Sequence, residues 1–318
     1  MRAPRPPHGG VRPPRGARKL GAARRFLDRW IIAALCSVLA LTSGCSALRI
    51  GYGTAPDLVY WWLDRYVDFD AAQTQRVRQA LAQWFAWHRR TQLPDYAALL
   101  VRAQAEVMAD TTAARVCEWQ ADLIQRANTA FDRAVPAAAD ILPSITLEQI
   151  AHIEQRYAKT NSEFRDDYLQ ADPAKRAAAN VKRTVERAET LYGKLDDKQR
   201  AQLAVALARS PFDAELWLAE RRMRQRDALQ LLNKLIRDKA SREQTQTALR
   251  AYADRIEHSP QEAYRRYSDR LTEFNCAFAA TLHNGMSTAQ RRHAAQTLAG
   301  WEGDLRALAA AKVDSPAD

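Results

Sequence analysis

Glycine is scarce in this chain, and its distribution excludes a β-rich fold. The 318 residues contain 11 glycines, and none lies between Gly53 and Gly193. Sheet proteins rely on glycine for their many tight turns. We therefore expect an all-α protein of about ten helices, arranged as an elongated multi-helix bundle or an irregular array of helical hairpins. Prolines are spaced as helix starts would be, so we expect helices to begin near seven of them: Pro56, Pro94, Pro136, Pro143, Pro173, Pro211 and Pro260.

Apolar runs long enough to cross a bilayer are also lacking. Residues 30–41 form an apolar run of only twelve, whereas a spanning helix needs about 20 apolar residues. The run follows a basic segment and precedes small residues, which is the pattern of a secretory signal peptide. An uncleaved N-terminal anchor and an ordinary soluble secreted protein are the alternatives.

The small residues after this run have the pattern of an acylation site. Residues 42–46 read TSGCS, which resembles a bacterial lipoprotein signal that is cut before its cysteine. The resemblance implies a signal peptide over residues 1–44 and lipid on Cys45, although Leu41 stands one position earlier than is usual. Several acyl chains on one cysteine hold a protein firmly to a membrane. Because Ser46 rather than aspartate follows Cys45, the resemblance implies the periplasmic face of the outer membrane in a Gram-negative bacterium.

The excess of positive charge lies in this same N-terminal segment. The chain carries 48 Lys+Arg against 37 Asp+Glu, a net of +11. Residues 1–44 hold nine bases and one acid, or +8, which leaves +3 for the other 274 residues. The charge therefore indicates export and gives no support for a nucleic-acid partner.

Only two of the four cysteines remain once the export segment is set aside. Cys36 lies inside the apolar run and Cys45 is the expected lipid site, leaving Cys117 and Cys276. In an oxidising compartment these two can form a disulfide that closes a loop of about 160 residues and adds a few kcal/mol of stability. Two buried free thiols are the alternative. Cys276 lies off the main apolar stripe of its helix, so the bond needs a helix packed on that second side.

Motifs that would mark an enzyme or a metal site are missing from the sequence. No Glu-x-x-His, His-Glu-x-x-His, Gly-x-Ser-x-Gly, Cys-x-x-Cys or phosphate-binding glycine loop occurs. We therefore expect no catalytic residues, no metal and no cofactor. An envelope hydrolase with an unfamiliar site around His88 and Arg89 is kept as the least favoured hypothesis.

A helix start signal occurs five times. Each copy is a Ser, Thr or Asp followed three residues later by glutamine, the pattern of a capping box: Asp70–Gln73, Thr146–Gln149, Asp196–Gln199, Ser241–Gln244 and Ser287–Gln290. Ile145, Leu195 and Met286 precede three of these boxes, which thereby resemble the Leu-Thr-x-x-Gln motif of small periplasmic chaperones of the Spy and CpxP type. Ordinary helix capping explains the pattern equally well.

Aromatic residues concentrate between positions 60 and 88, where four of the eight tryptophans occur. Two successive helices there could form a dense local core, or a hydrophobic groove for a lipid tail, a client peptide or the membrane surface. The possible groove residues are Trp61, Trp62, Tyr66, Trp84, Trp87 and His88.

Basic residues concentrate between positions 221 and 239. They are Arg221, Arg222, Arg224, Arg226, Lys234, Arg237 and Lys239. A solvated helix face is the simpler interpretation, and contact with anionic lipid, lipopolysaccharide or cell-wall polymer is the alternative.

A broader resemblance covers most of the chain after Cys45. It rests on short stretches: residues 48–52, 60–68 and 87–96, with Gln73 between them, then residues 216–222, 282–284, 290–292, 301–302 and 304–306. These are similar to a family of uncharacterised proteobacterial lipoproteins, catalogued as a domain of unknown function. The resemblance implies a lipid-anchored, all-α periplasmic domain with no assigned activity.

Taken together, the sequence predicts four regions: a signal peptide over 1–44, a lipidated cysteine and short tether over 45–56, a single all-α domain over 57–313 and a disordered tail over 314–318. The expected function is a non-enzymatic binding or scaffold lipoprotein of the cell envelope, attached to the membrane through Cys45. The alternative is a chaperone-like binder of unfolded envelope proteins. Envelope proteins or an anionic envelope polymer are the expected partners.

Overall fold

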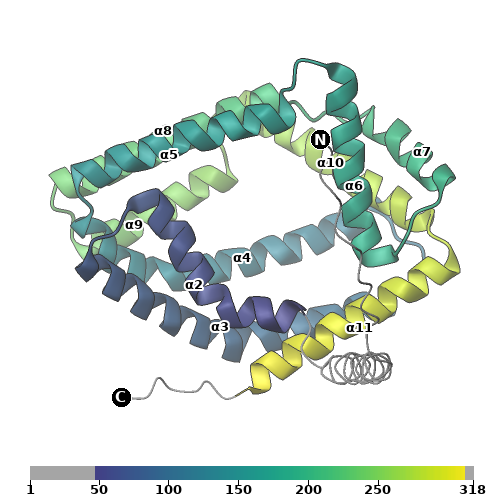
Figure 1. Ribbon diagram of the computed structural model, residues 1–318, viewed down its shortest axis with the longest axis horizontal. Coiled ribbons are helices and arrows are strands. Elements are labelled where there is room, and N and C mark those ends of the chain that lie inside the picture. The colour runs from purple at the N-terminus through teal and green to yellow at the C-terminus, as the bar shows by residue number, and fades with distance from the viewer. Residues whose placement is uncertain (1–46, 312–318) are drawn as a thin grey trace, which may run out of the picture. The chain divides into compact units, whose positions relative to one another are not determined.

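The computed structural model describes residues 47–311, and this part of the chain is helical from end to end (Figure 1). The predicted lipid site Cys45, the signal peptide and the C-terminal tail lie outside the described residues. The described part contains ten α-helices, which confirms the predicted all-α array of about ten helices. The helices, with one 3-10 turn (η1), are α2 (Ala47–Val67), α3 (Ala71–Glu106), α4 (Ala113–Ile141), η1 (Leu142–Ser144), α5 (Leu147–Tyr168), α6 (Pro173–Tyr192), α7 (Asp197–Leu207), α8 (Ala214–Arg237), α9 (Arg242–Glu257), α10 (Glu262–Asn284) and α11 (Thr288–Ala310).

The chain divides into two units, Met1–Ile50 and Gly51–Asp318. Within the second unit, α3 packs along α11, α4 packs along α9 and α10, and α5 lies beside α8 (Figure 1). Helix α2 begins at Ala47, so most of the segment expected as a tether is helical. A tertiary contact accounts for this, because the Tyr52 hydroxyl bonds to His88 of α3 at 2.9 Å.

Three prolines expected to start helices lie inside them instead. Pro56, Pro94 and Pro136 are interior residues of α2, α3 and α4. An interior proline costs about 3 kcal/mol because it removes a backbone hydrogen bond. Helix α3 nevertheless continues for 36 residues. Leu93 and Ala97, on either side of Pro94, are almost fully buried, so packing outweighs the local signal.

All five predicted capping boxes are confirmed, with both reciprocal hydrogen bonds present in each. Four of them meet in two pairs. In the first cap pair, formed by the boxes that start α3 and α5, the side-chain amides of Gln73 and Gln149 bond to each other at 3.1 and 2.6 Å. In the second cap pair, which starts α7 and α11, Gln199 and Gln290 do the same at 2.8 and 2.9 Å.

The two cap pairs share one crossed pattern. Each glutamine Nε2 also donates to the backbone carbonyl two positions before the partner's capping residue. The four acceptors are Ser144, Asp68, Gly285 and Lys194, at 2.7, 2.8, 3.2 and 3.1 Å. Each pair therefore ties together two helix starts and the two loops that lead into them.

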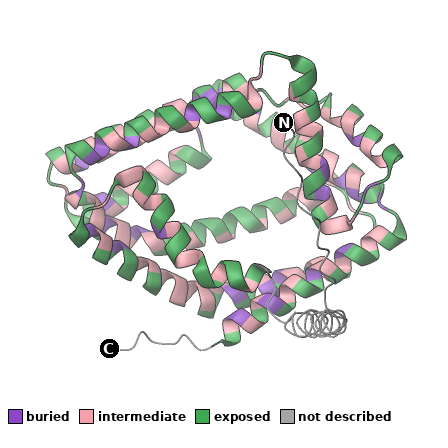
Figure 2. Cartoon of the chain, viewed as in Figure 1, coloured by how far each residue is buried: buried purple, intermediate pink, exposed green. Residues whose placement is uncertain are grey.

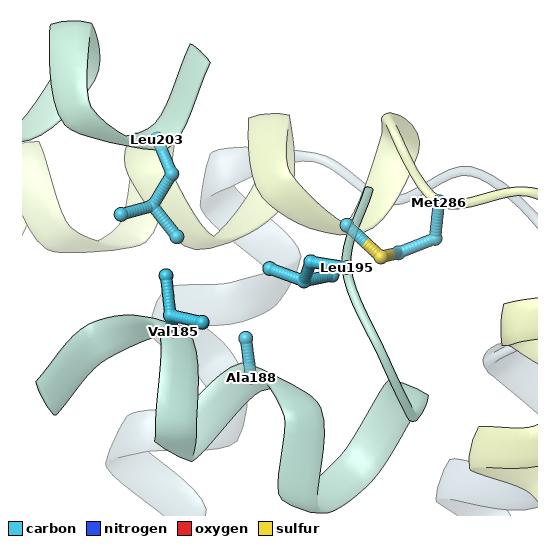
Figure 3. Close-up of a cluster of buried hydrophobic side chains, with 5 residues drawn as sticks. All are labelled: Val185, Ala188, Leu195, Leu203 and Met286. Atoms are coloured by element: carbon cyan, nitrogen blue, oxygen red, sulfur yellow. The ribbon is translucent and has the colours of Figure 1, made fainter. Parts of the chain in front are cut away.

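Buried residues occur in several separate stretches along the helices (Figure 2). One cluster lies beside the second cap pair, where Leu195 and Met286, each directly before a capping residue, pack with Val185, Ala188 and Leu203 (Figure 3). These five side chains are at most 8% exposed. The second cap pair therefore adjoins a closed hydrophobic core.

A disulfide joins Cys117 of α4 to Cys276 of α10, with 5.5 Å between the Cα atoms. Of the two alternatives left open by the sequence, the structure has the bonded form. Helix α4 packs on α10, on the side away from the apolar stripe of α10 that begins with Tyr264 and Tyr267. Cys276 is 1% exposed, so the bond lies in the interface between the two helices.

Candidate functional site: an apolar groove

A groove of about 710 Å³ lies between α2, α3 and α4, beside the first cap pair. Most of its lining is aliphatic or aromatic. Helix α2 supplies Val59, Leu63 and Val67, and helix α3 supplies Val77, Leu81, Trp84, Phe85 and His88. Helix α4 supplies the facing wall, which includes Ala134, Ala137 and Ile141. The volume lies in the range of small-molecule binding sites.

Phe69 and Ile145 link the groove to the first cap pair. Each directly precedes a capping residue, Asp70 or Thr146, and each lines the groove. Leu195 and Met286 hold the corresponding positions in the second cap pair but pack in a closed core. The same local motif therefore positions a closed core at one place and a groove at the other.

An aromatic stack fixes the α3 side of the groove. His88 stacks on Trp84 with ring centroids 4.8 Å apart, and Phe85 meets Trp84 edge to face at 5.0 Å. Trp84 Nε1 donates to the backbone oxygen of Ala130 in α4 at 3.0 Å. Tryptophan buries a large apolar ring while its N–H still needs an acceptor, and this bond orients the ring in the wall.

His88 lies in the wall of the groove and is bonded to a residue of α2. Its Nδ1 lies 2.9 Å from the Tyr52 hydroxyl. Burial lowers the pKa of His88 and raises the pKa of Tyr52 to about 12. The Tyr52 hydroxyl and the His88 imidazole therefore form a hydrogen-bonded pair in a partly buried setting. Within residues 47–311, no carboxylate bonds to the His88 ring.

The charged residues of the groove lie on α4 and at the start of α9. The Arg242 guanidinium pairs with Asp140 at 3.0 Å, so these two charges satisfy each other. The Arg133 guanidinium lies 5.8 Å from the centre of the Trp87 ring. Among the described residues it forms no ion pair with a carboxylate. Arg133 is exposed and provides the one cationic lining group of the described groove that has no acidic partner.

The structure separates the six predicted groove residues into two groups. Trp84 and His88 line the groove, and Trp87 contacts both at its edge. Trp61 and Trp62 are each 58% exposed. Tyr66 contacts Trp62 and also Tyr157 of α5. These last three residues lie on α2 outside the groove lining.

The groove wall on α4 was missed by sequence reasoning. Ala134, Ala137 and Ala138 carry no chemical signal, and alanine is equally typical of any helix interior. The aromatic cluster at 60–88 does mark the α3 side. A wall of small residues can be identified only after the packing of α4 against α3 is known.

The predicted basic cluster divides among several environments. Arg224 pairs with the buried Glu220 at 2.9 Å, and Lys234 and Arg237 both pair with Asp238 at the end of α8. Arg226 and Lys239 are exposed, and Arg222 is half-buried. Arg221 lies over the ring of Trp217, with 5.6 Å between Cζ and the ring centre. The cluster is thus not one continuous basic face.

No group of three or more His, Cys, Asp or Glu side chains within residues 47–311 is placed to hold a metal ion. None of the helices in this range combines the length and apolar character required to cross a membrane.

The comparisons identify a family and nothing more specific. Residues 65–265 match the model of a family of unknown function (DUF6279). This segment contains α3 to α9 entire, and with them the α3 and α4 walls of the groove and the first cap pair. The comparisons found no similar curated protein and no similar solved structure.

Proposed function

The chain belongs to the DUF6279 family of unknown function, and we propose that it is a non-enzymatic envelope lipoprotein that binds an amphiphile. The acyl portion of the amphiphile occupies the groove between α2, α3 and α4, and its anionic head meets Arg133. The observation that carries this proposal is the apolar groove, with one cationic side chain left without an acidic partner.

The energetics favour an extended apolar occupant with an anionic head. Each CH₂ group moved from water into an apolar site contributes about 0.8 kcal/mol, and aliphatic side chains line most of this groove. The Arg242–Asp140 pair is already satisfied. Arg133 can form a charge-assisted bond with a carboxylate or phosphate. A purely apolar ligand would leave the Arg133 guanidinium without an anionic partner.

Three features support a place in the cell envelope. Residues 1–44 have the pattern of an export signal and are followed by Cys45, and a disulfide such as Cys117–Cys276 persists in oxidising compartments. Ser46 favours the outer membrane. In this proposal an acylated Cys45 attaches the chain to the membrane, immediately before the start of α2.

Binding of palmitate, measured by titration calorimetry on the full chain, tests the groove. We expect Ala137→Trp to abolish binding, because the indole fills the α4 wall. We expect Arg133→Gln to weaken binding about tenfold, as loss of a charged hydrogen bond does. Ala127→Trp is the matched control, since Ala127 is exposed on the same helix. No palmitate binding, or equal loss in the control, would overturn the groove assignment.

Acylation is tested separately by labelling cells with radioactive palmitate. We expect label in the wild-type chain and none in Cys45→Ala. Label that persists in Cys45→Ala would place the lipid elsewhere, and absence of label in both would remove the anchor from the proposal. Neither result depends on the groove.

A chaperone-like function is the second candidate, favoured by the outward face of α2. Leu58, Trp61 and Trp62 are between 51 and 58% exposed there, and exposed apolar clusters mark interaction surfaces. If this face binds unfolded clients, the chain will slow aggregation of reduced α-lactalbumin. Trp61→Ser/Trp62→Ser will then abolish the effect while leaving palmitate binding unchanged.

A further inference from the structure

A second cavity, separate from the groove, lies between α5, α6, α8 and α10. Its volume is about 820 Å³, and the loop before α8 closes one side with Ser210 and Phe212. Polar, charged and aromatic side chains line this cavity, whereas aliphatic residues line most of the groove. Leu271 and Phe278 of α10 also line it, and Phe278 packs in addition against the closed core beside the second cap pair.

An aromatic stack with an arginine at each end forms one wall of this cavity. Phe164 stacks on Tyr168 and on Trp217, with 4.6 Å between ring centroids in each pair and interplanar angles of 19° and 18°. The Arg183 guanidinium lies over the Tyr168 ring at 4.4 Å, and Arg221 lies over the Trp217 ring at 5.6 Å. Cation–π contacts of this kind hold a guanidinium in place without neutralising it.

The charges around this wall are left without opposite partners. Within the described residues, Arg183, Arg187 and Arg221 form no ion pair. The Nη1 atom of Arg183 donates to the backbone oxygen of Asp167 at 3.5 Å. Most of the five N–H donors of this guanidinium therefore remain open. The carboxylates of Glu163 and Asp167 also line the cavity. Three bases against two acids give this cavity a small positive excess.

We propose that this cavity binds an anionic saccharide, a sugar that carries a carboxylate or phosphate group. Guanidinium groups pair with both kinds of anion in a two-point geometry. The side-chain amides of Asn180 and Asn275 and the hydroxyl of Thr184 can donate to and accept from sugar hydroxyls. The aromatic wall provides the apolar surface against which sugar C–H groups pack.

The two acids narrow the class of ligand. Glu163 and Asp167 accept hydrogen bonds from sugar hydroxyls but repel a ligand with a charge on every unit. Like-charge contacts disfavour such partners strongly. The cavity is therefore suited to a sugar with isolated anionic groups rather than to a nucleic acid. This inference does not depend on the proposed occupant of the groove.

The experiment titrates the full chain with glucuronate, which carries a single carboxylate, and with glucose 6-phosphate, maltotriose and inorganic phosphate. Tryptophan fluorescence and calorimetry report binding. We expect at least one of the two anionic sugars to bind at least tenfold more tightly than maltotriose and than inorganic phosphate. The affinities for the carboxylate sugar and the phosphate sugar, compared with each other, show which anion is preferred. Binding should weaken as salt rises, because charge pairing is screened.

Arg183→Gln and Arg221→Gln should each weaken anionic sugar binding about tenfold, with palmitate binding unchanged. Arg226→Gln is the matched control, because Arg226 is an exposed base on the same helix as Arg221. A circular dichroism melt verifies that each variant folds. Failure of both anionic sugars to bind, or equal loss in the Arg226→Gln control, would overturn the proposal. Binding of maltotriose at the same affinity would also overturn it.

Discussion

The two cap pairs use the same hydrogen bonds and differ in what surrounds them. At the second cap pair, Leu195 and Met286 are 1% and 6% exposed and pack into a closed core (Figure 3). At the first cap pair, Phe69 and Ile145 hold the same positions beside a groove of about 710 Å³. The burial of the glutamines does not follow the burial of their surroundings. Gln73, beside the open groove, is fully buried, whereas Gln199 and Gln290, beside the closed core, are half-buried.

The comparison shows that two helix starts can be joined without the space beside them being filled. The crossed glutamines fix where two helix starts meet, and the side chains of the facing helices decide whether the space beside them is filled. At the second cap pair the helices supply Val185, Ala188 and Leu203 to complete the filling. At the first, the facing wall on α4 includes three alanines, whose short side chains leave the space open.

The largest effect is expected from the disulfide, which links the groove wall on α4 to the helix that leads into the second cap pair. Cys117→Ser/Cys276→Ser removes a cross-link between residues 159 apart. We expect the free energy of unfolding to fall by about 4 kcal/mol, because the unfolded chain gains conformational freedom. Urea titration measures the change. Wild-type protein under reducing conditions should match the variant, and no shift under reduction would contradict the prediction.

Loss of a glutamine from a cap pair should cause the second-largest decrease in the free energy of unfolding. Gln73→Ala removes bonds to Gln149 and Ser144 and leaves buried polar groups unpaired, so we expect a loss of about 3 kcal/mol. Gln199→Ala should cost less, because the second cap pair is more exposed to water. Gln244→Ala is the control, since its box has no crossed partner among the described residues. It should cost about 1 kcal/mol, as loss of a helix cap does. Equal losses in urea unfolding would show that crossing adds nothing.

Truncation of the residue before the cap tests the filled and open environments directly. Leu195→Ala leaves a cavity in a closed core and should cost about 3 kcal/mol. Ile145→Ala only enlarges an existing groove, so we expect about half that cost. Thermal and urea unfolding of the two variants provide the comparison. A larger cost at Ile145 would mean that the groove is filled in the native protein.

The smallest effect concerns pH at the groove. Burial lowers the pKa of His88, so unfolded His88 takes up a proton near pH 6.5 while folded His88 takes one up only at lower pH. Stability is therefore complete above pH 6.5 and declines as pH falls from 6.5 to the folded pKa. His88→Gln should flatten this part of the curve of unfolding free energy against pH. Urea unfolding at a series of pH values measures this curve, and an unchanged slope in His88→Gln would contradict the prediction.

Local signals in the sequence were reliable where local chemistry decides the structure. The five capping boxes form as expected, because each depends on residues within one turn. Pro94 shows the limit of this reasoning. Its local preference is to end a helix, but burial of Leu93 and Ala97 keeps α3 intact. Only the tertiary packing could reveal this.

The candidate site was predictable on one side only. The aromatic cluster identified Trp84 and His88, because aromatic side chains concentrate where a surface or core is built. Trp61 and Trp62 were grouped with them by proximity in the sequence, yet they point away from the groove. The cavity wall formed by Phe164, Tyr168 and Trp217 combines α5 and α8. Residues from separate helices come together only through the fold.

The crossed glutamines also have a consequence for how the chain folds. A capping box ordinarily forms as soon as its own turn does, independently of the rest of the chain. Here the glutamine side chains complete their hydrogen bonds only when residues 76 or 91 positions apart have met, and closing such long loops is slow compared with helix formation. These four helix starts therefore become fully hydrogen-bonded late, when the helical hairpins have already docked.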